Sequence, residues 1–395
     1  MRRSAISTST VTTDVVVIGG GAIGLSAAWR IAQRGGRTTI VDDVVGRGAS
    51  WVAAGMLAPV TEVHYGEEPL LRLNLESSAM YGDFADELEQ LTGRPVGYRR
   101  CGTLLVARDR DDNAALEELY RFQIRLGLEV ERLRSSECRE MEPALGANVR
   151  GGIFVKNDHQ VDSRALVTAL EAACVQGGVR FVRTRTKTVQ VEHGRVVGVT
   201  LEDGSAIGCE RVVVAAGAWS ASVDGIPAGA RPPLRPVKGQ LLHLRSAPGR
   251  LSTAAALAGP NIRGIEVYLV VRGDGRIVIG ATSEEQGFDT SVTAGAVMEL
   301  LRNAYELVPG VAELELTEAI AGLRPATPDN APVMGPSVLE GLIWATGHYR
   351  NGILLTPITA DAVAEVVASG SLPDALESFS PRRFEQISAD AGVLQ

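Results

Sequence analysis

The sequence contains no apolar run long enough to cross a membrane. Its longest apolar stretch, residues 15–29, is interrupted by glycine and falls short of the roughly 18 apolar residues that indicate a membrane span. Residues 1–13 carry two arginines but no apolar segment, so they do not match a secretory signal. We therefore expect a disordered leader over residues 1–13, no membrane span and a cytoplasmic protein.

Cysteine is scarce, and the few cysteines are scattered. None forms a C-x-x-C pair, and none lies near a cluster of histidines. This spacing supports neither a zinc site nor a redox dithiol, so no metal site is predicted. The four positions, expected to be core or surface thiols, are Cys101, Cys138, Cys174 and Cys209.

Lysine is nearly absent, and acidic residues outnumber basic ones. The 47 Asp and Glu residues against 39 Lys and Arg residues give a net charge of −8. No basic stripe interleaved with aromatic residues is present, which argues against a nucleic-acid partner. With 395 residues and 45% hydrophobic content, the chain has enough apolar material for two cores.

What the sequence does contain is a strand, turn, helix and strand pattern over residues 13–43. The β-branched run at 14–18 predicts a buried parallel strand, and the pattern continues with a helix over 22–33 and a second strand over 38–41. Residues 19–24 follow the G-x-G-x-x-G spacing. The pattern predicts a dinucleotide whose phosphates lie at a helix N-terminus.

Each glycine of the turn has its own steric reason. Gly19 lets the chain turn tightly, Gly21 lets the backbone approach a pyrophosphate, and Gly24 lets the helix pack closely on the sheet. Asp42 ends the second strand, eighteen residues after Gly24, at the distance where an acidic side chain reaches ribose hydroxyls. A glycine turn with a purely structural role is the alternative reading.

The remaining pattern predicts an α/β fold with two domains. Helices are expected over 70–91, 113–127, 162–176, 297–308 and 353–368, and strands over 98–107, 151–156, 211–215, 237–244, 267–271, 276–280 and 342–345, with an antiparallel meander over 177–205. We predict a discontinuous Rossmann-type dinucleotide-binding domain from residues 14–61, 151–231 and 318–375. Residues 62–150 and 232–317 form a second α+β substrate domain on an antiparallel sheet, and 376–395 form a C-terminal tail. The pocket between the domains is the expected substrate site.

Two segments rich in small residues favour close approach of a ligand. One contains Ala54 and Gly55, for which a plain tight turn is the alternative. The other contains Ala216, Gly217 and Trp219, at the carboxyl end of the strand over 211–215, where open α/β sheets bind ligands.

Five segments, in this order along the chain, resemble the D-amino-acid-oxidase-like flavoprotein family, and within it the glycine oxidases of the thiamine pathway. They are the glycine turn, WVAAGML, VVVAAGAWS, GLRPATPD and GHYRNGILLTP. The resemblance implies noncovalent FAD and oxidative deamination of glycine, related small amines or D-amino acids. The products would be a 2-oxo acid, ammonia and hydrogen peroxide, with oxygen as electron acceptor. It also implies a homo-oligomer and a place in thiamine (thiazole) biosynthesis.

The resemblance also implies roles for individual residues. The adenosine half of FAD would contact Ala22, Ile23, Asp42 and Asp43, with a backbone contact from Thr188. The flavin half would contact Ala49, Ser50, Ala54, Gly55 and Met56. The turn of His348, Tyr349, Arg350, Asn351, Gly352, Ile353 and Leu354 would wrap the isoalloxazine edge. Arg324 would bind the substrate carboxylate, with Tyr268 and Arg350 completing the pocket. The chain departs from the family at Asp42, where Glu is usual.

Elementary chemistry supports part of this assignment. A planar guanidinium pairs bidentately with a carboxylate, so Arg324 suits an amino-acid anchor. Arg350 lies just ahead of a predicted helix, whose N-terminal dipole stabilises negative charge. His348 could equally be a hydrogen-bonded turn histidine. The sequence shows no evident buried carboxylate or histidine to act as a general base, which favours hydride transfer over proton abstraction.

Three alternatives stay open at this point. A D-amino-acid dehydrogenase would pass electrons to a quinone or membrane carrier instead of oxygen. A sarcosine-oxidase-like enzyme often holds its flavin through a cysteine, and none of the four cysteines lies in the C-terminal turn. A non-catalytic protein would bind FAD without oxidising any amine.

Overall fold

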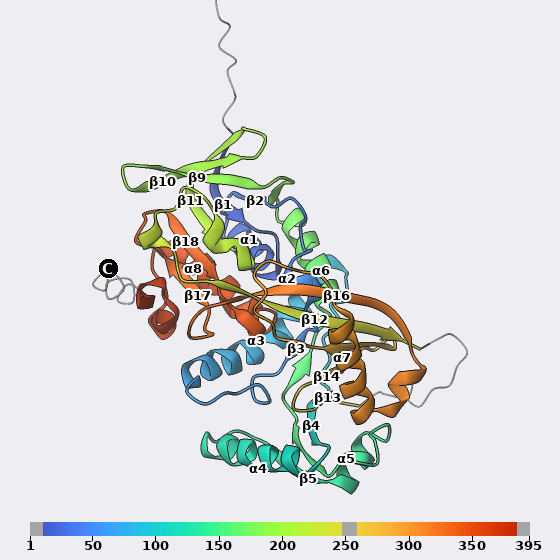
Figure 1. The fold of residues 1–395 in the computed structure, drawn as a ribbon. Helices are drawn as coiled ribbons and strands as arrows, with labels where there is room; N and C mark the ends of the chain where they lie inside the picture. The colour runs from blue at the N-terminus through green and yellow to red at the C-terminus, as the bar shows by residue number, and fades with distance from the viewer. Residues whose placement is uncertain (1–10, 247–258, 385–395) are drawn as a thin grey trace, which may run out of the picture.

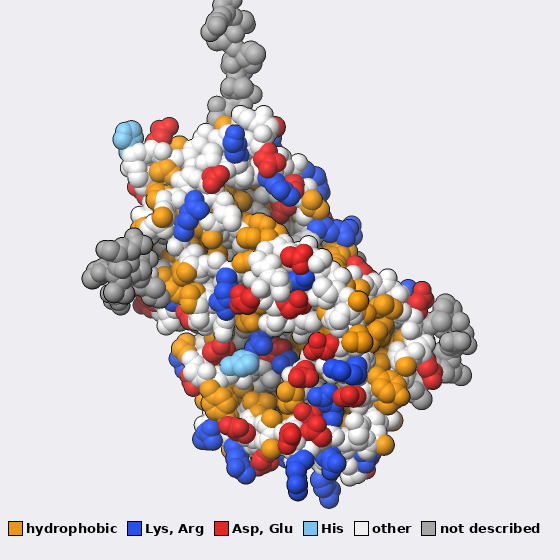
Figure 2. Space-filling view, viewed as in Figure 1, with side chains coloured by type: hydrophobic (Ala, Val, Ile, Leu, Met, Phe, Trp, Pro, Cys, Tyr) orange, Lys and Arg blue, Asp and Glu red, His pale blue; other side chains and the backbone are white. Residues whose placement is uncertain are grey.

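A computed structural model describes residues 11–246 and 259–384, which form two eight-stranded sheets with helices on their outer faces (Figure 1). Among these residues, no helix combines the length and apolar character that a bilayer span needs. Acidic and basic side chains lie interspersed over most of the face shown in Figure 2.

The first sheet is mostly parallel. Its strand order is β17-β18-β11-β1-β2-β8, and β10 and β9 extend β11 as an antiparallel meander. The strands are β1 (Val11–Ile18), β2 (Thr38–Val41), β8 (Arg180–Val182), β9 (Thr186–Glu192), β10 (Arg195–Leu201), β11 (Ala206–Val214), β17 (Val333–Pro336) and β18 (Leu342–Thr346). Because β1 pairs in parallel with both β2 and β11, their carboxyl ends meet at one edge.

Both faces of this sheet are buried, as a continuous β-branched run predicts. Val15 and Val17 pack with α1 (Ala22–Gln33), α6 (Ser163–Gln176), α8 (Thr356–Ser369) and α3 (Glu68–Thr92). Val16 and Ile18 point to the opposite face and pack with residues of β9, β10 and β18. The alternation along β1 therefore belongs to two separate cores.

The second sheet has the order β16-β12-β15-β14-β13-β4-β6-β5, antiparallel except between β13 and β4. Its strands are β4 (Thr103–Ala107), β5 (Glu131–Arg134), β6 (Gly151–Val155), β12 (Arg235–Arg245), β13 (Asn261–Arg263), β14 (Tyr268–Val271), β15 (Arg276–Gly280) and β16 (Glu315–Ala326). The helix α7 (Ala294–Leu307) covers one face. The opposite face packs on Val52 and Ala54 of the first domain.

Shorter elements complete the described chain. They are α2 (Ala49–Val52), α4 (Arg110–Arg125), α5 (Ser135–Met141), the small sheet of β3 (Met56–Leu57) and β7 (His159–Gln160), and the 3-10 helices η1 (Gly217–Ser222), η2 (Ala228–Ala230), η4 (Pro309–Glu313), η5 (Tyr349–Asn351), η6 (Asp374–Phe379) and η7 (Pro381–Phe384).

The predicted α/β class with a second antiparallel sheet is confirmed, and α1, β2 and β15 have the expected bounds. The helix α6 begins after Asp162, whose carboxylate caps it by accepting from the Arg164 and Ala165 amides. β16 was not predicted as a strand because its first residues, 315–318, are mostly polar and do not alternate regularly like a half-buried strand.

Several domain bounds were wrong. Residues 11–13 belong to β1, not to a disordered leader, and residues 1–10 lie outside the described chain. β6 and β16 were assigned to the FAD-binding domain but belong to the second sheet, whereas α3 packs on α6 and α8 instead of the substrate domain. Within the predicted tail, Phe379 and Phe384 are buried in the first domain's two cores; residues 385–395 lie outside the described chain.

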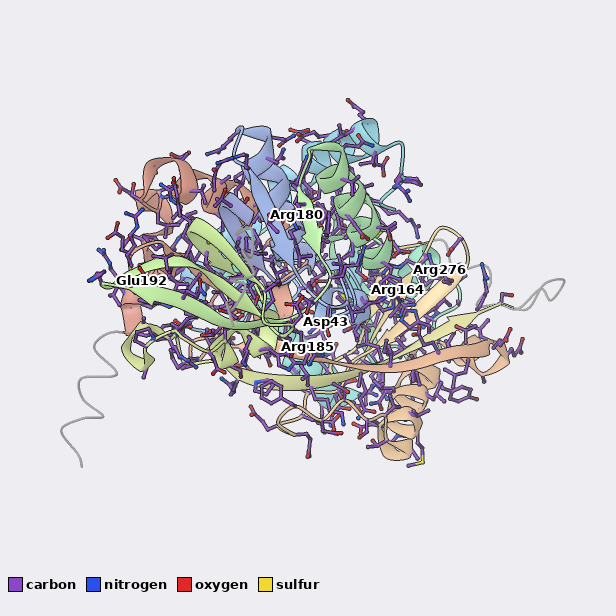
Figure 3. The ribbon with its side chains drawn as sticks, turned by 90° about the horizontal axis from the view of Figure 1, so that it is seen from above. Asp43, Arg164, Arg180, Arg185, Glu192 and Arg276 are labelled. Atoms are coloured by element: carbon purple, nitrogen blue, oxygen red, sulfur yellow. The ribbon has the colours of Figure 1, made fainter. Side chains whose placement is uncertain are left out.

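Arginines join α6 to the second sheet. Arg164 of α6 donates to Glu318 at 2.7 Å, and Arg276 of β15 donates to the helix-capping Asp162 at 2.6 Å. Figure 3 shows Arg164 and Arg276 near one another on the side where α6 approaches the second sheet. These ion pairs fix the two sheets relative to each other at the rim of their contact.

Arg272 makes the most buried connection between the sheets. Its side chain leaves the β14–β15 hairpin and donates to Gln160 Oε1, to the Val161 carbonyl and to the Ala54 carbonyl at 2.6–2.9 Å. Only 6% of the residue is exposed, and this burial lowers the pKa of the Arg272 guanidinium to about 10. The cation therefore stays charged at neutral pH and serves three buried acceptors.

We expect Arg272→Ala to lower the free energy of unfolding by about 3–5 kcal/mol, because each buried acceptor left without a donor costs roughly 1–3 kcal/mol. Chemical denaturation of both proteins measures this change. Arg121→Ala is the matched control, since Arg121 is 69% exposed in an i,i+4 pair with Glu117 and such pairs contribute about 0–1 kcal/mol. Equal losses in the two variants would contradict the role of Arg272.

Candidate functional site

A cavity of about 730 Å³ lies between the carboxyl edge of the first sheet and the second sheet. It extends from the end of β2 past the glycine turn to the strands β14 and β16 and to the turn at 348–353. Predicted site residues in its wall are Gly19, Gly21, Ala22, Ile23, Asp42, Asp43, Ala49, Ser50, Ala54, Gly55, Met56, Ala216, Gly217, Trp219, Tyr268, Arg324, His348, Tyr349, Arg350, Asn351, Gly352 and Ile353. Segments far apart in sequence thus line one cavity.

The glycine turn is built by close backbone contacts. Gly19 has φ +106°, and a Cβ placed on Gly24 would lie 1.9 Å from the Gly19 carbonyl oxygen. Gly24 is therefore a packing residue behind the cavity wall, as its position in the motif predicts. The amide of Ala22, the first residue of α1, donates to Ser50 Oγ at 2.9 Å, which links the helix N-terminus to α2.

Asp42 braces this turn with both carboxylate oxygens. Oδ2 accepts from the Gly20 amide at 2.5 Å and Oδ1 from the Val44 amide at 2.8 Å, while the residue still lines the cavity. Asp43 accepts from Arg185 at 2.7 Å, and Figure 3 shows these two side chains together beside the first sheet. A carboxylate anchored in this way presents a fixed negative charge at the end of β2.

Two predicted cofactor contacts do not reach the cavity. Thr188 does not line the cavity, whose wall at the start of β9 is formed by Arg185 and Thr186. The Thr188 hydroxyl donates to the Val189 carbonyl. Leu354 is buried in the helical core, and its carbonyl accepts from Ser77 at 2.7 Å. Neither side chain lines the cavity, and the backbone contact of Thr188 and the place of Leu354 in the flavin turn stay predictions.

The small residues at 53–55 line the cavity and also pack closely against the protein backbone. Gly55 has φ +72°, and an added Cβ would lie 2.0 Å from the Val161 carbonyl oxygen. Only glycine fits this position without strain. The predicted close approach is real, but its partner on this side is the protein backbone.

Trp219 stands at the cavity's outer rim. Its residue is 46% exposed, and its ring lies 5.8 Å from the ring of Phe288, which comes from the second domain. Ala216 and Gly217, which lead into η1, line the cavity below it.

His348 is a structural residue. Its Nε2 lies 3.0 Å from Thr359 Oγ1 of α8, and burial lowers the pKa of His348 to about 3. The imidazole is therefore neutral in the folded protein at physiological pH. This geometry favours the turn-histidine reading and places the neighbouring Tyr349, with φ +46°, at the cavity.

Arg324 and Tyr268 lie flat over glycines of neighbouring strands. A Cβ on Gly239 would lie 2.4 Å from Arg324 Nη2, and a Cβ on Gly280 would lie 2.3 Å from the Tyr268 hydroxyl oxygen. Arg324 Nη1 donates to the Thr282 carbonyl at 3.1 Å. Burial raises the pKa of Tyr268 to about 12, so its hydroxyl keeps the proton it can donate. The sequence analysis missed both glycines.

The sequence analysis also missed a carboxylate in the cavity wall. Glu62 lines the cavity, its side chain is 15% exposed, and its Oε1 accepts from Arg263 at 2.5 Å. Burial alone raises the pKa of Glu62, but the charges of Arg263 and Arg350 outweigh burial and hold the pKa below its usual value. Glu62 was not among the predicted site residues, because nothing in the local pattern TEVHY shows which way its side chain points.

Comparison with known proteins now decides the family. The family model described as FAD dependent oxidoreductase matches residues 14–366. The chain belongs to the FAD-dependent oxidoreductase family.

Individual relatives are similar over nearly all of this oxidoreductase chain. It is 35% identical to the glycine oxidase of Geobacillus kaustophilus, over 94% of this chain and 97% of that protein. The crystal structure of glycine oxidase from that organism superposes with a TM-score of 0.85 at 33% identity, covering 94% and 98% of the two chains. Identity to the bifunctional protein ThiO/ThiG of Synechocystis is also 35%, over 94% of this chain but 54% of that protein. The chain thus spans about half the length of the bifunctional relatives.

The cavity of this oxidoreductase fits FAD. A pyrophosphate needs bare backbone near a helix N-terminus, and the turn at Gly19 and Gly21 before α1 supplies it. Asp42 would hold the ribose, and Ala49, Ser50 and Met56 with the turn at 349–353 would hold the flavin half. No described residue of the cavity wall is a cysteine, which agrees with noncovalent binding.

We predict that Asp42→Ala weakens FAD binding at least tenfold, because the ribose loses a charge-assisted acceptor worth about 1.5–3 kcal/mol and the glycine turn loses its brace. Titration of the apoprotein with FAD, followed by flavin fluorescence, measures the affinity. Asp14→Asn is the control, since Asp14 lies in the middle of β1, does not line the cavity and pairs with Arg37 at 2.5 Å. Equal affinity in the Asp42 variant and the unmutated protein would refute the assignment.

His348 predicts how stability depends on pH. The unfolded chain protonates this histidine near its ordinary value, roughly 6.5, whereas the folded protein does so only at about 3. Stability is therefore lost as pH falls below about 6.5, at up to about 1.4 kcal/mol per pH unit. His348→Gln, which keeps a partner for Thr359, should lose less stability between pH 7.5 and 5 in urea titrations. Parallel losses in both proteins would contradict this prediction.

Proposed function

We propose that this chain is a FAD-dependent oxidase that deaminates glycine and related small amines or D-amino acids to a 2-oxo acid, ammonia and hydrogen peroxide. One observation carries the proposal. Arg324 of β16 lies over Gly239 of β12, and Tyr268 of β14 lies over Gly280 of β15, so both side chains extend inward over the two strands between them, in the wall of the cavity that also contains the glycine turn. A guanidinium and a protonated hydroxyl in one apolar wall form a receptor for a carboxylate.

The relatives support this reading. The glycine oxidase of Geobacillus kaustophilus matches almost its whole length to this chain. The ThiO/ThiG proteins, matched over about half their length, motivate the further proposal that the reaction serves thiamine biosynthesis.

The residues of the chain would divide the work as follows. FAD, when bound, supplies the acceptor for the hydride that leaves the substrate Cα. Arg324 binds the substrate carboxylate, and Tyr268 donates its hydroxyl hydrogen to the same group. Because these two side chains rest on Gly239 and Gly280, their positions are fixed before substrate arrives, which lowers the entropic cost of orientation.

Arg350 has a different setting from Arg324. It is exposed at the cavity's rim and donates through Nη2 to His64. Its charge lies next to the turn that would hold the flavin, so it can stabilise negative charge at that edge. We propose a supporting electrostatic role for Arg350 and the anchoring role for Arg324.

Oxygen as electron acceptor, self-association into a homo-oligomer and a cytoplasmic location remain predictions. A D-amino-acid dehydrogenase would bleach with substrate but yield little peroxide in air. A sarcosine-oxidase-like enzyme would prefer the N-methyl amine. Turnover of glycine, sarcosine and D-alanine with and without oxygen separates these three functions, and a protein that bleaches with none of them is not an amine oxidase.

We predict that Arg324→Ala lowers kcat/KM for glycine at least a hundredfold. The substrate carboxylate is then partly buried without its cation, which costs roughly 3–5 kcal/mol. Arg324→Lys should recover little, since an ammonium lacks the two-pronged geometry. Peroxide production measures the rate, and the visible spectrum checks that flavin content is normal.

Ethylamine is the matched substrate control, because it has no carboxylate. Its oxidation, where measurable, should change little in Arg324→Ala. Equal losses for glycine and ethylamine would show that Arg324 supports the fold or the cofactor instead of the substrate.

A further inference from the structure

Glu62 lies in the cavity wall because hydrogen bonds to a buried residue fix the loop that carries it. This loop runs from β3 to α3, and the Val60 and Thr61 amides both donate to the buried carboxylate of Asp158, at 3.2 and 2.7 Å. Residue 62 follows directly, so its position relative to the cavity is fixed. Glu62 is thus a built part of the wall, not a mobile surface side chain.

Glu62 lies among cations. Arg263 of β13 pairs with it at 2.5 Å, and both side chains are largely buried, at 17% and 15% exposure. The charge of Arg350 also acts on Glu62. Arg350 itself contacts His64. Burial and the nearby Arg350 lower the pKa of His64, which favours the neutral imidazole, so His64 adds no further positive charge. Glu62 is therefore the carboxylate that balances Arg263 and Arg350 here.

The same carboxylate acts on the substrate end of the cavity. Tyr268 feels the charges of both Arg324 and Glu62, and all three residues line the cavity. A substrate anchored through one carboxylate at Arg324 therefore extends its remaining atoms into space whose electrostatics Glu62 partly sets.

We propose that Glu62 is a specificity-determining residue that restricts the site to amines carrying a single carboxylate. The inference rests on the proposed function only in that Arg324 takes the first carboxylate. A second carboxylate on the substrate meets the negative charge of Glu62, which lies in the cavity wall, pairs with Arg263 and also interacts with the charge of Arg350. In a partly buried cavity such like-charge contacts are weakly screened.

Removing the charge of Glu62 should turn this region into an anion subsite. In Glu62→Gln and Glu62→Ala, Arg263 loses its carboxylate partner and, with Arg350, can bind a carboxylate supplied by the substrate. Specificity would then change by loss of a repulsive group as well as by a new attraction.

The test compares glycine with iminodiacetate, which is glycine bearing a second carboxymethyl group on nitrogen. We expect the ratio of kcat/KM for iminodiacetate to kcat/KM for glycine to rise at least tenfold in Glu62→Gln and in Glu62→Ala. Glu67→Gln is the matched control: Glu67 lies in the same segment and accepts from Asn330 at 2.9 Å, but it does not line the cavity. Its ratio should stay at the unmutated value.

A binding measurement gives a readout that does not depend on turnover. Diglycolate has the shape of iminodiacetate but cannot be deaminated, and methoxyacetate lacks its second carboxylate. Titrated into the FAD-loaded proteins and followed by the visible spectrum, diglycolate should bind at least tenfold more tightly to both Glu62 variants than to the unmutated protein. Methoxyacetate should change much less.

The outcomes separate this inference from the proposed function. An unchanged ratio and unchanged diglycolate affinity in both Glu62 variants, with normal flavin content, would overturn the role of Glu62 while leaving glycine oxidation intact. An equal rise in Glu67→Gln would overturn it as well, because the effect would then reflect net charge. An unmutated protein that does not oxidise glycine would overturn the proposed function. Diglycolate binding would still test the role of Glu62 in that case.

Discussion

The structure depends on a backbone contact that only glycine permits. A Cβ on Gly24 would lie only 1.9 Å from the Gly19 carbonyl oxygen. Gly19 in turn packs against the backbone of Ala215, just after β11. These approaches bring the start of α1 onto the carboxyl ends of β1 and β11. The cavity exists because a helix N-terminus and bare backbone meet at that edge, where no side chain fills the space.

Arginine side chains join the two sheets. A guanidinium has five N–H donors in a fixed plane, and Arg272 uses its plane to serve three acceptors from the first domain's loops. Arg164 and Arg276 form ion pairs nearer the surface. A lysine ammonium lacks the planar set of donors that reaches separate carbonyls in this geometry. This gives a physical reason why arginine, not lysine, joins the two domains.

Charge in the cavity is arranged in two zones. Arg324 and Tyr268 rest on glycines of the second sheet and face the part of the cavity where a small substrate meets the flavin turn. Glu62, Arg263 and Arg350 form a second group between that region and solvent. In the proposed function the first zone would anchor one carboxylate, and the second would control which additional groups the site tolerates. Anchoring and selectivity would then use different elements and could change independently.

The sequence by itself determined the local units and the dinucleotide class of their ligand. The glycine spacing, the β-branched strand and the acid at Asp42 specified β1, α1 and β2 with nearly correct bounds, because those signals arise from sterics within about thirty residues. The helix predicted over 162–176 likewise differs from α6 only at Asp162, which caps the helix. The C-terminal turn and Arg324 were found through family motifs, which fix residue identity but not surroundings.

Only the tertiary structure decided which side chains face the cavity. Thr188 and Leu354 point elsewhere because strand register and helical packing, not motif position, set their directions. β6 and β16 joined the second sheet through pairing with strands distant in sequence. Glu62 became part of the site because Asp158, nearly a hundred residues later, holds its loop. These outcomes depend on long-range contacts, whose partners no local pattern names.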